Sequence, residues 1–192
     1  MFSQLLEKQR DGRNKDTIVN KNYIESGEYR KKFNNITNDK VLNRLLYNCA
    51  KEMLLHRSGT SYEDMYWIDP SSKKIIASET NQSYPGRIVY SRATQKSIKK
   101  YNGLITIHNH PSGFPPSVED FNSNYTNKYQ LGIICAHNGK IFCYYATEII
   151  NILDASICLK KYLKMGYDDY DAQRFMIIKL AERYSISFEE VF

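Results

Sequence analysis

The stretch around two closely spaced histidines constrains the fold of this chain more than any other part of its sequence. Residues 104–107 are apolar, include β-branched side chains and follow an Asn-Gly pair, a pattern that predicts a buried strand. Alternate residues of an extended chain point to the same side. His108 and His110, which end this strand, can therefore approach one ion while Asn109 faces away.

A loop rich in proline and glycine follows the histidines. Residues 111–116 include three prolines and one glycine, which exclude both a strand and a helix. Ser117 is then a favourable N-cap for a helix, and Asp120 falls in its first turn. A short loop can bring the Asp120 carboxylate back to the histidines. The pattern Ser-x-x-Asp is also that of a capping box, which is the purely structural alternative.

Two imidazoles and a carboxylate are ligands that zinc accepts, and three protein ligands leave the fourth tetrahedral position to water. Zinc lowers the pKa of such a water from about 15.7 to about 7, but a nearby carboxylate must still accept the proton. Our candidate for this base is Glu63, because it precedes residues 65–68, the predicted first strand. Glu52 and Glu79 are the alternatives.

Together these residues resemble the JAB/JAMM (MPN+) zinc metalloprotease family, whose motif is a Glu at the head of an early strand, then His-x-His and Ser-x-x-Asp. The run His-Asn-His-Pro-Ser-Gly is most similar to the bacterial RadC-like branch, and the resemblance covers residues 62–146. It implies that His108, His110 and Asp120 bind one Zn²⁺ per chain, that Glu63 is the general base, and that the Ser117 hydroxyl supports the oxyanion. The family usually has seven residues between the second His and the Ser, whereas six stand here.

The wider pattern predicts an α/β domain, a mixed β-sheet flanked by helices, with the JAB/MPN-like and cytidine-deaminase-like layering that the resemblance implies. We expect a polar, loosely ordered arm over residues 1–38, the metallohydrolase domain over 39–150 and a helical extension over 151–192. Expected strands cover residues 65–68, 74–78, 86–90, 104–107, 131–135 and 141–145. Expected helices cover residues 39–56, 91–100, 117–129 and two C-terminal segments separated at Gly166-Tyr167. Asn138-Gly139 predicts a type I′ hairpin turn.

Composition narrows the class of protein. The net charge of +6 comes from basic pairs and triplets scattered along the chain, which favours solvated faces over a nucleic-acid-binding stripe. No apolar run approaches the roughly 20 residues of a membrane span, so we expect a cytoplasmic protein with no membrane contact. The four cysteines lack a Cys-x-x-Cys pair and predict reduced thiols, with a Cys135–Cys143 bridge as the alternative.

The resemblance implies a zinc-dependent metalloprotease or isopeptidase that acts on a protein or peptide, such as a ubiquitin-like or other protein tail. Two other classes stay open. One is a RadC-like protein associated with DNA, which requires a contiguous basic face. The other is a non-catalytic, zinc-stabilised interaction scaffold that belongs to a phage or mobile element. His56 and His137 are interpreted as ordinary helix-end and loop residues. The sequence indicates no oligomeric state.

Overall fold

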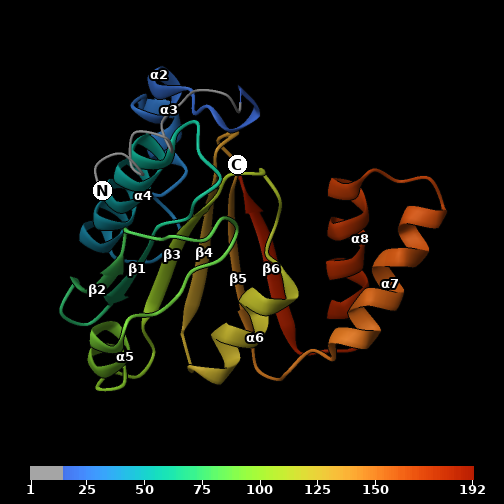
Figure 1. The fold of residues 1–192 in the computed structure, drawn as a ribbon. Helices are drawn as coiled ribbons and strands as arrows, with labels where there is room; N and C mark the ends of the chain where they lie inside the picture. The colour runs from blue at the N-terminus through green and yellow to red at the C-terminus, as the bar shows by residue number, and fades with distance from the viewer. Residues whose placement is uncertain (1–14) are drawn as a thin grey trace.

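The computed structural model describes residues 15–192 and has the predicted α/β architecture, with a six-stranded mixed sheet at its centre (Figure 1). The strand order is β2-β1-β3-β4-β5-β6, and only the β3–β4 pair is parallel. The strands are β1 (Met65–Asp69), β2 (Lys74–Glu79), β3 (Ile105–His110), β4 (Leu131–Ala136), β5 (Ile141–Ala146) and β6 (Ile186–Val191).

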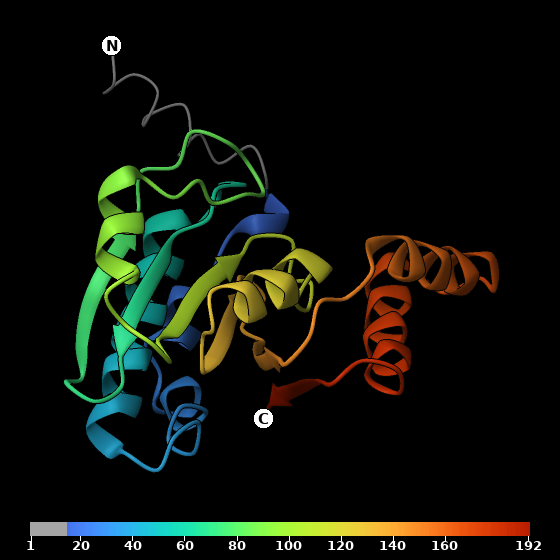
Figure 2. The ribbon, with the colours of Figure 1, turned by 90° about the horizontal axis from the view of Figure 1, so that it is seen from below.

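Helices cover both faces of this sheet. They are η1 (Lys15–Thr17), α2 (Lys21–Ile24), α3 (Gly27–Lys31), α4 (Lys40–Arg57), α5 (Arg92–Ile98), α6 (Val118–Thr126), α7 (Ile152–Lys164) and α8 (Asp169–Ala181). The long helix α4 packs on one face, against Ile105 and Ile107 of β3. Helix α6 packs on the other face (Figure 2). Side chains of α6 and α8 belong to one apolar cluster on that side. Strand β3 therefore carries two buried faces with different neighbours.

The segment before α4 is more ordered than its polar sequence indicates. Ile24 of α2, Tyr29 of α3 and Phe33 of the turn after α3 are buried in the cluster around α4, and the rings of Tyr29 and Phe33 contact Tyr47. The expected loose order is therefore wrong for residues 15–38, because a few large side chains anchor helices too short to show a periodic pattern. Residues 1–14 of the predicted arm lie outside the described residues.

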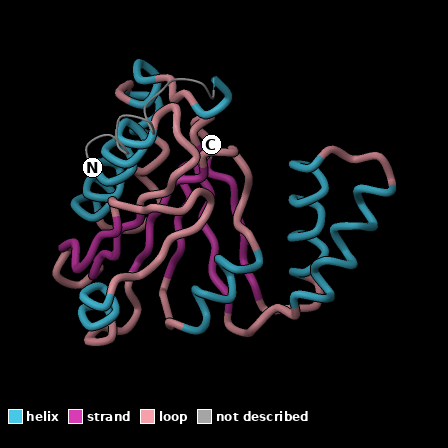
Figure 3. The backbone as a smooth tube through the Cα atoms, in the orientation of Figure 1, coloured by secondary structure: helices cyan, strands magenta, loops and turns pink. Residues whose placement is uncertain are grey.

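Two expectations about strands are also wrong. Residues 86–90 form a loop between β2 and α5 (Figure 3), where the Gln82 amide, rather than a strand, bonds both the N–H and the carbonyl of Val89. In the C-terminal region, α7 and α8 are the two expected helices, but the chain then returns as β6. This strand pairs antiparallel with β5 and completes the sheet.

The predicted hairpin joins β4 to β5, but its turn is not of type I′. Gly139 has a φ of 85°, whereas Asn138 is not among the residues with positive φ, and the Gly139 N–H bonds the Ala136 carbonyl. Type I′ requires positive φ at both central residues. This arrangement is instead typical of a type I turn followed by a glycine in the left-handed region. All four cysteines are free thiols. Among the described residues, no helix is both long and apolar enough to cross a bilayer.

Candidate metal centre

Strand β3 brings the two histidines together on the face that α6 covers. Both imidazoles are nearly buried, and their Nε2 atoms lie 3.0 Å apart. Asp120, in the first turn of α6, lies close to both imidazoles. Its Oδ1 lies 3.3 Å from His108 Nε2, and its Oδ2 lies 3.6 Å from His110 Nε2. The three predicted ligands thus form one cluster that could hold a metal ion.

The spacing of these atoms fits a tetrahedral ion. With bonds of about 2.0–2.2 Å to nitrogen and oxygen, zinc separates its ligand atoms by roughly 3.3 Å. The two Nε2 atoms lie 3.0 Å apart, and the nearest carboxylate oxygen is Oδ1 for His108, at 3.3 Å, and Oδ2 for His110, at 3.6 Å; all three distances are close to that value. Two histidines and one aspartate leave a fourth position for water or a substrate oxygen. The residues present therefore fit a zinc ion.

The hydrogen bonds around the ligands agree with this assignment. His110 Nδ1 lies 3.0 Å from the Phe114 carbonyl, so it carries the proton and Nε2 has a free lone pair. That lone pair is directed at His108 Nε2. His108 Nδ1 is buried and has no partner among the described residues. Without a metal the His108 Nε2–H can donate to the lone pair of His110 Nε2, and in a metal site both Nε2 atoms would be available as ligands.

Ser117 holds Asp120 in place. Its backbone N–H and its hydroxyl each donate to Asp120 Oδ2 at 2.7 Å, while the Asp120 N–H donates to Ser117 Oγ at 3.1 Å. This is a complete capping box. Burial alone raises the pKa of the Asp120 carboxyl, but the imidazoles of His108 and His110 and the Ser117 N–H outweigh it. The pKa is therefore held well below its usual range. The capping box is therefore formed, and Asp120 at the same time lies in the cluster that could hold a metal ion.

A cavity of about 1000 Å³ opens at this cluster and is lined by the three ligands, Glu63 and Ser117. Met65 pairs with His108, and Glu63, two residues before it, lines the same cavity near His110 and Asp120, whose charges act on it. Burial raises the pKa of Glu63 from 4.5 to about 7, with His110 opposing the rise and Asp120 adding to it. A carboxyl with a pKa near neutrality can both accept and release a proton.

The other carboxylates are less suited to proton transfer. Glu52 is exposed on α4, and Glu79 accepts a hydrogen bond from the Ser91 N–H; neither lines the cavity. Glu119 and Asp169 do line the cavity, but both residues are exposed. The structure thus brings Glu63, and neither of its two alternatives, to the ligand cluster.

The loop between His110 and Ser117 is held by a helix that the sequence did not connect to the site. Gln173 of α8 donates to the carbonyls of Pro115 and Pro116 at 3.0 and 3.1 Å. Leu159, Leu163 and Asp169 of the same helical hairpin line the cavity. The six-residue loop is long enough for Asp120 to lie within 3.3–3.6 Å of both histidines. The C-terminal helices form one wall of the cavity.

The other two histidines lie outside this cluster and have other partners. His56 Nδ1 lies 2.6 Å from Asp64 Oδ2. His137, which the sequence presents as an ordinary loop residue, is buried, and burial lowers its pKa from 6.5 to about 4. Its Nδ1 donates to the Thr17 carbonyl at 2.7 Å, and its Nε2 accepts from the Asn109 amide at 3.0 Å. Nothing local in the sequence indicates these partners, because Thr17 is 120 residues away.

No family model matches the chain, and neither a curated protein nor a solved structure is significantly similar to it. The function is therefore inferred from the geometry of the site.

Proposed function

We propose that this protein is a zinc-dependent metalloprotease or isopeptidase of the JAB/JAMM type, in the RadC-like branch. The observation that carries the proposal is the shared cavity of the His108, His110 and Asp120 cluster and Glu63. Ligands with one open position, next to a carboxyl whose pKa is about 7, are what metal-assisted hydrolysis requires.

His108, His110 and Asp120 would hold one zinc ion through two Nε2 atoms and a carboxylate. When bound, zinc would polarise a substrate carbonyl and lower the pKa of a water molecule toward about 7. Glu63 would accept the proton from that water and deliver it to the leaving amine. Glu63 must be ionised at the start of the reaction, and with a pKa of about 7 roughly half of the molecules carry the ionised form at neutral pH.

The Ser117 hydroxyl would support the oxyanion. In the structure it donates to Asp120 Oδ2, but the Ser117 backbone N–H donates to the same oxygen. The hydroxyl can therefore rotate toward a substrate oxygen while Asp120 keeps one of its two donors. Donors directed at the developing charge stabilise such a transition state.

The substrate we propose is a protein or peptide segment, such as a ubiquitin-like tail. The cavity volume of about 1000 Å³ is at the upper end for small-molecule pockets, which suits an extended peptide. Its lining combines apolar side chains such as Leu159 and Phe114 with the polar groups of the site.

The first test is elemental analysis of protein purified without chelator. We expect about one zinc per chain in the wild type and loss of the metal in His108→Ala and Asp120→Ala. Absence of metal from the gently purified wild type would refute the hydrolase proposal.

The second test compares Glu63→Gln with Glu119→Gln in peptide and isopeptide cleavage assays. Glu63→Gln should keep the metal and lose about 10²- to 10⁴-fold in rate, the usual contribution of general acid–base catalysis. Glu119→Gln is the matched control, because Glu119 lines the same cavity with an exposed side chain and should remain active. If Glu63→Gln cleaves the substrates as fast as Glu119→Gln does, the non-catalytic scaffold is favoured.

A further inference from the structure

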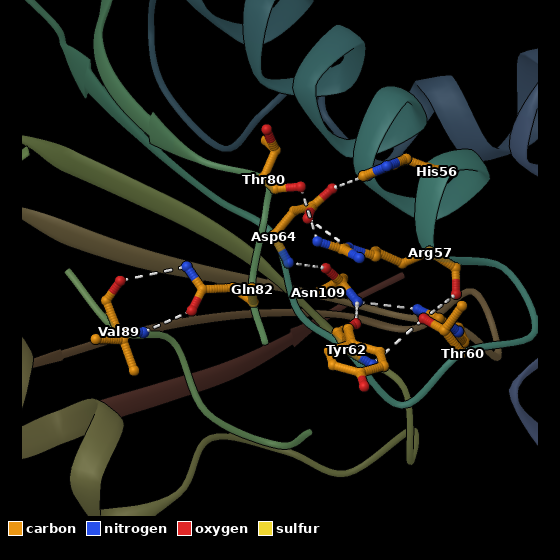
Figure 4. A network of polar contacts seen from close by, with 10 residues as sticks. His56, Arg57, Thr60, Tyr62, Asp64, Thr80, Gln82, Val89 and Asn109 are labelled. Atoms are coloured by element: carbon orange, nitrogen blue, oxygen red, sulfur yellow. Dashed lines mark hydrogen bonds and ion pairs between the residues drawn. The ribbon is translucent and has the colours of Figure 1, made fainter. Parts of the chain in front are cut away.

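Asn109 lies between the two histidine ligands but belongs to the opposite face of β3. It is fully buried, and its amide is directed at the start of β1 rather than into the cavity (Figure 4). We propose that Asn109 is a positioning residue that fixes Glu63 by hydrogen bonding the peptide groups on both sides of it. This inference rests on the proposed function, because that function makes Glu63 the general base.

The regular ladder between β1 and β3 ends before it reaches Glu63. The last registered pair is Met65 with His108. Beyond it, the Asn109 N–H donates to the Asp64 carbonyl at 3.3 Å, and the Asn109 side chain makes the remaining bonds. Its Oδ1 accepts from the Asp64 N–H at 2.7 Å, and its Nδ2 donates to the Tyr62 carbonyl at 3.1 Å.

These two side-chain bonds restrain both backbone dihedrals of Glu63. The Tyr62 carbonyl belongs to the peptide group before the Glu63 Cα, and the Asp64 N–H belongs to the peptide group after it. Rotation about φ moves the first group relative to the Cα, and rotation about ψ moves the second. One amide that holds both groups therefore fixes the direction in which the Glu63 side chain leaves the backbone.

The chemistry of the contact requires a carboxamide. An asparagine side chain offers one acceptor oxygen and two N–H donors. The oxygen is used by Asp64, one donor by Tyr62 and the second by His137 Nε2 at 3.0 Å. His137 is oriented in turn by its bond to the Thr17 carbonyl. The orientation of the amide is therefore set by three different partners.

A second anchor prevents the start of β1 from moving as a unit. The Asp64 side chain is buried, with Oδ1 at 2.5 Å from Arg57 Nε and Oδ2 at 2.6 Å from His56 Nδ1, both at the end of α4 (Figure 4). Helix α4 thus holds Asp64 while Asn109 holds the peptide groups. Proton transfer needs heavy-atom distances of about 2.6–3.2 Å, and a shift of about 1 Å in a catalytic group can cost roughly 10²-fold in rate.

The test replaces Asn109 with Ala and, as a milder change that puts one hydroxyl in place of the amide, with Ser. We expect both variants to retain one zinc per chain, because neither removes a ligand. We expect kcat to fall roughly 10- to 100-fold while KM changes less than about threefold. In the zinc-loaded protein, hydrogen exchange of the Asp64 amide should accelerate at least about tenfold, since it loses its acceptor. If Asn109→Ala does not fold, the same measurements on Asn109→Ser decide.

The matched control is Asn43→Ala. Asn43 is also a buried asparagine that bridges backbone groups, donating to the carbonyls of Asn34 and Thr37 far from the site. Its replacement should lower stability and leave kcat unchanged. An equal loss of kcat in both variants would attribute the effect of Asn109 to general destabilisation and overturn the proposal.

The double variant that combines Asn109→Ala with Glu63→Gln tests whether Asn109 acts on the rate through Glu63. If Asn109 acts through Glu63, adding Asn109→Ala to Glu63→Gln should cause no further loss of rate. A full additional loss would overturn the inference. If Glu63→Gln is inactive but Asn109→Ala is fully active, this inference is overturned and the proposed function stands. A fully active Glu63→Gln would overturn the proposed function, and this inference with it.

Discussion

The buried imidazole of His137 makes the stability of the fold sensitive to mild acid. At neutral pH it is uncharged, with Nδ1 donating to Thr17 and Nε2 accepting from Asn109. Burial lowers its pKa from 6.5 to about 4. A protonated ring would also place a second N–H opposite the Asn109 amide donor. Protonation is therefore favoured in the unfolded chain and resisted in the folded one.

The sign and size of the effect follow from the two pKa values. Because the folded pKa is the lower one, the contribution of His137 is fully present above pH 6.5 and is lost as the pH falls toward about 4. Within this window, each unit of pH changes the unfolding free energy by about 1.4 kcal/mol. Acidification from pH 7.5 to pH 4.5 crosses about two such units and should remove about 2.5 kcal/mol of unfolding free energy through this residue.

The assay is urea unfolding of the chelator-treated wild type and of His137→Gln at pH 7.5 and pH 4.5. The raised pKa of Glu63 gives a contribution of opposite sign, which favours the fold as the pH falls below about 7. Glu63 is present in both proteins, so the difference between them cancels its contribution. The wild type should lose about 2.5 kcal/mol more than the variant on acidification. An identical pH dependence of the two proteins would refute a buried, neutral His137.

Three further predictions concern stability. Arg57→Met leaves the buried Asp64 carboxylate without its guanidinium and should cost about 3–5 kcal/mol in chemical unfolding, so a loss below about 1 kcal/mol would contradict the pairing. Gly132→Ala would place a Cβ 2.1 Å from the Tyr144 ring and should cost about 1–3 kcal/mol, whereas Gly27→Ala, with nothing within 4 Å, should be nearly neutral. Zinc at about 100 times its dissociation constant should add roughly 2.7 kcal/mol, measured by thermal unfolding. Chelator should reverse this gain, and a gain of equal size in a ligand variant would contradict the site.

The features of the site that the sequence predicts are those fixed by local rules. The alternation of a strand places His108 and His110 on one face, and a helix N-cap at Ser117 places Asp120 within reach of them. Both rules act over a few residues and need no knowledge of the rest of the chain. The position of Glu63 depends on the pairing of β1 with β3, which the sequence indicates only through strand order.

The features that the sequence did not predict depend on distant partners. Strand β6 has a weak apolar pattern, and its pairing with β5 stabilises it as a strand. Residues 86–90 have a strand-like composition but find no strand partner, and Ile88 and Tyr90 pack instead on the cluster around Trp67. Propensity is a weak guide when tertiary contacts decide the outcome. The burial of His137 has the same origin, because its partners come from η1 and β3.

Strand β3 combines two tasks because its side chains alternate between faces. His108 and His110 point toward α6 and converge with Asp120, while Asn109 between them points toward the α4 side and holds the peptide groups that flank Glu63. The backbone of one short, fully buried strand therefore links the metal ligands directly to the support of the candidate base. A displacement of β3 would move both together and preserve their relative geometry. A change at Asn109 alone would move the base and leave the ligands in place, which is why metal content and kcat should separate in its variants.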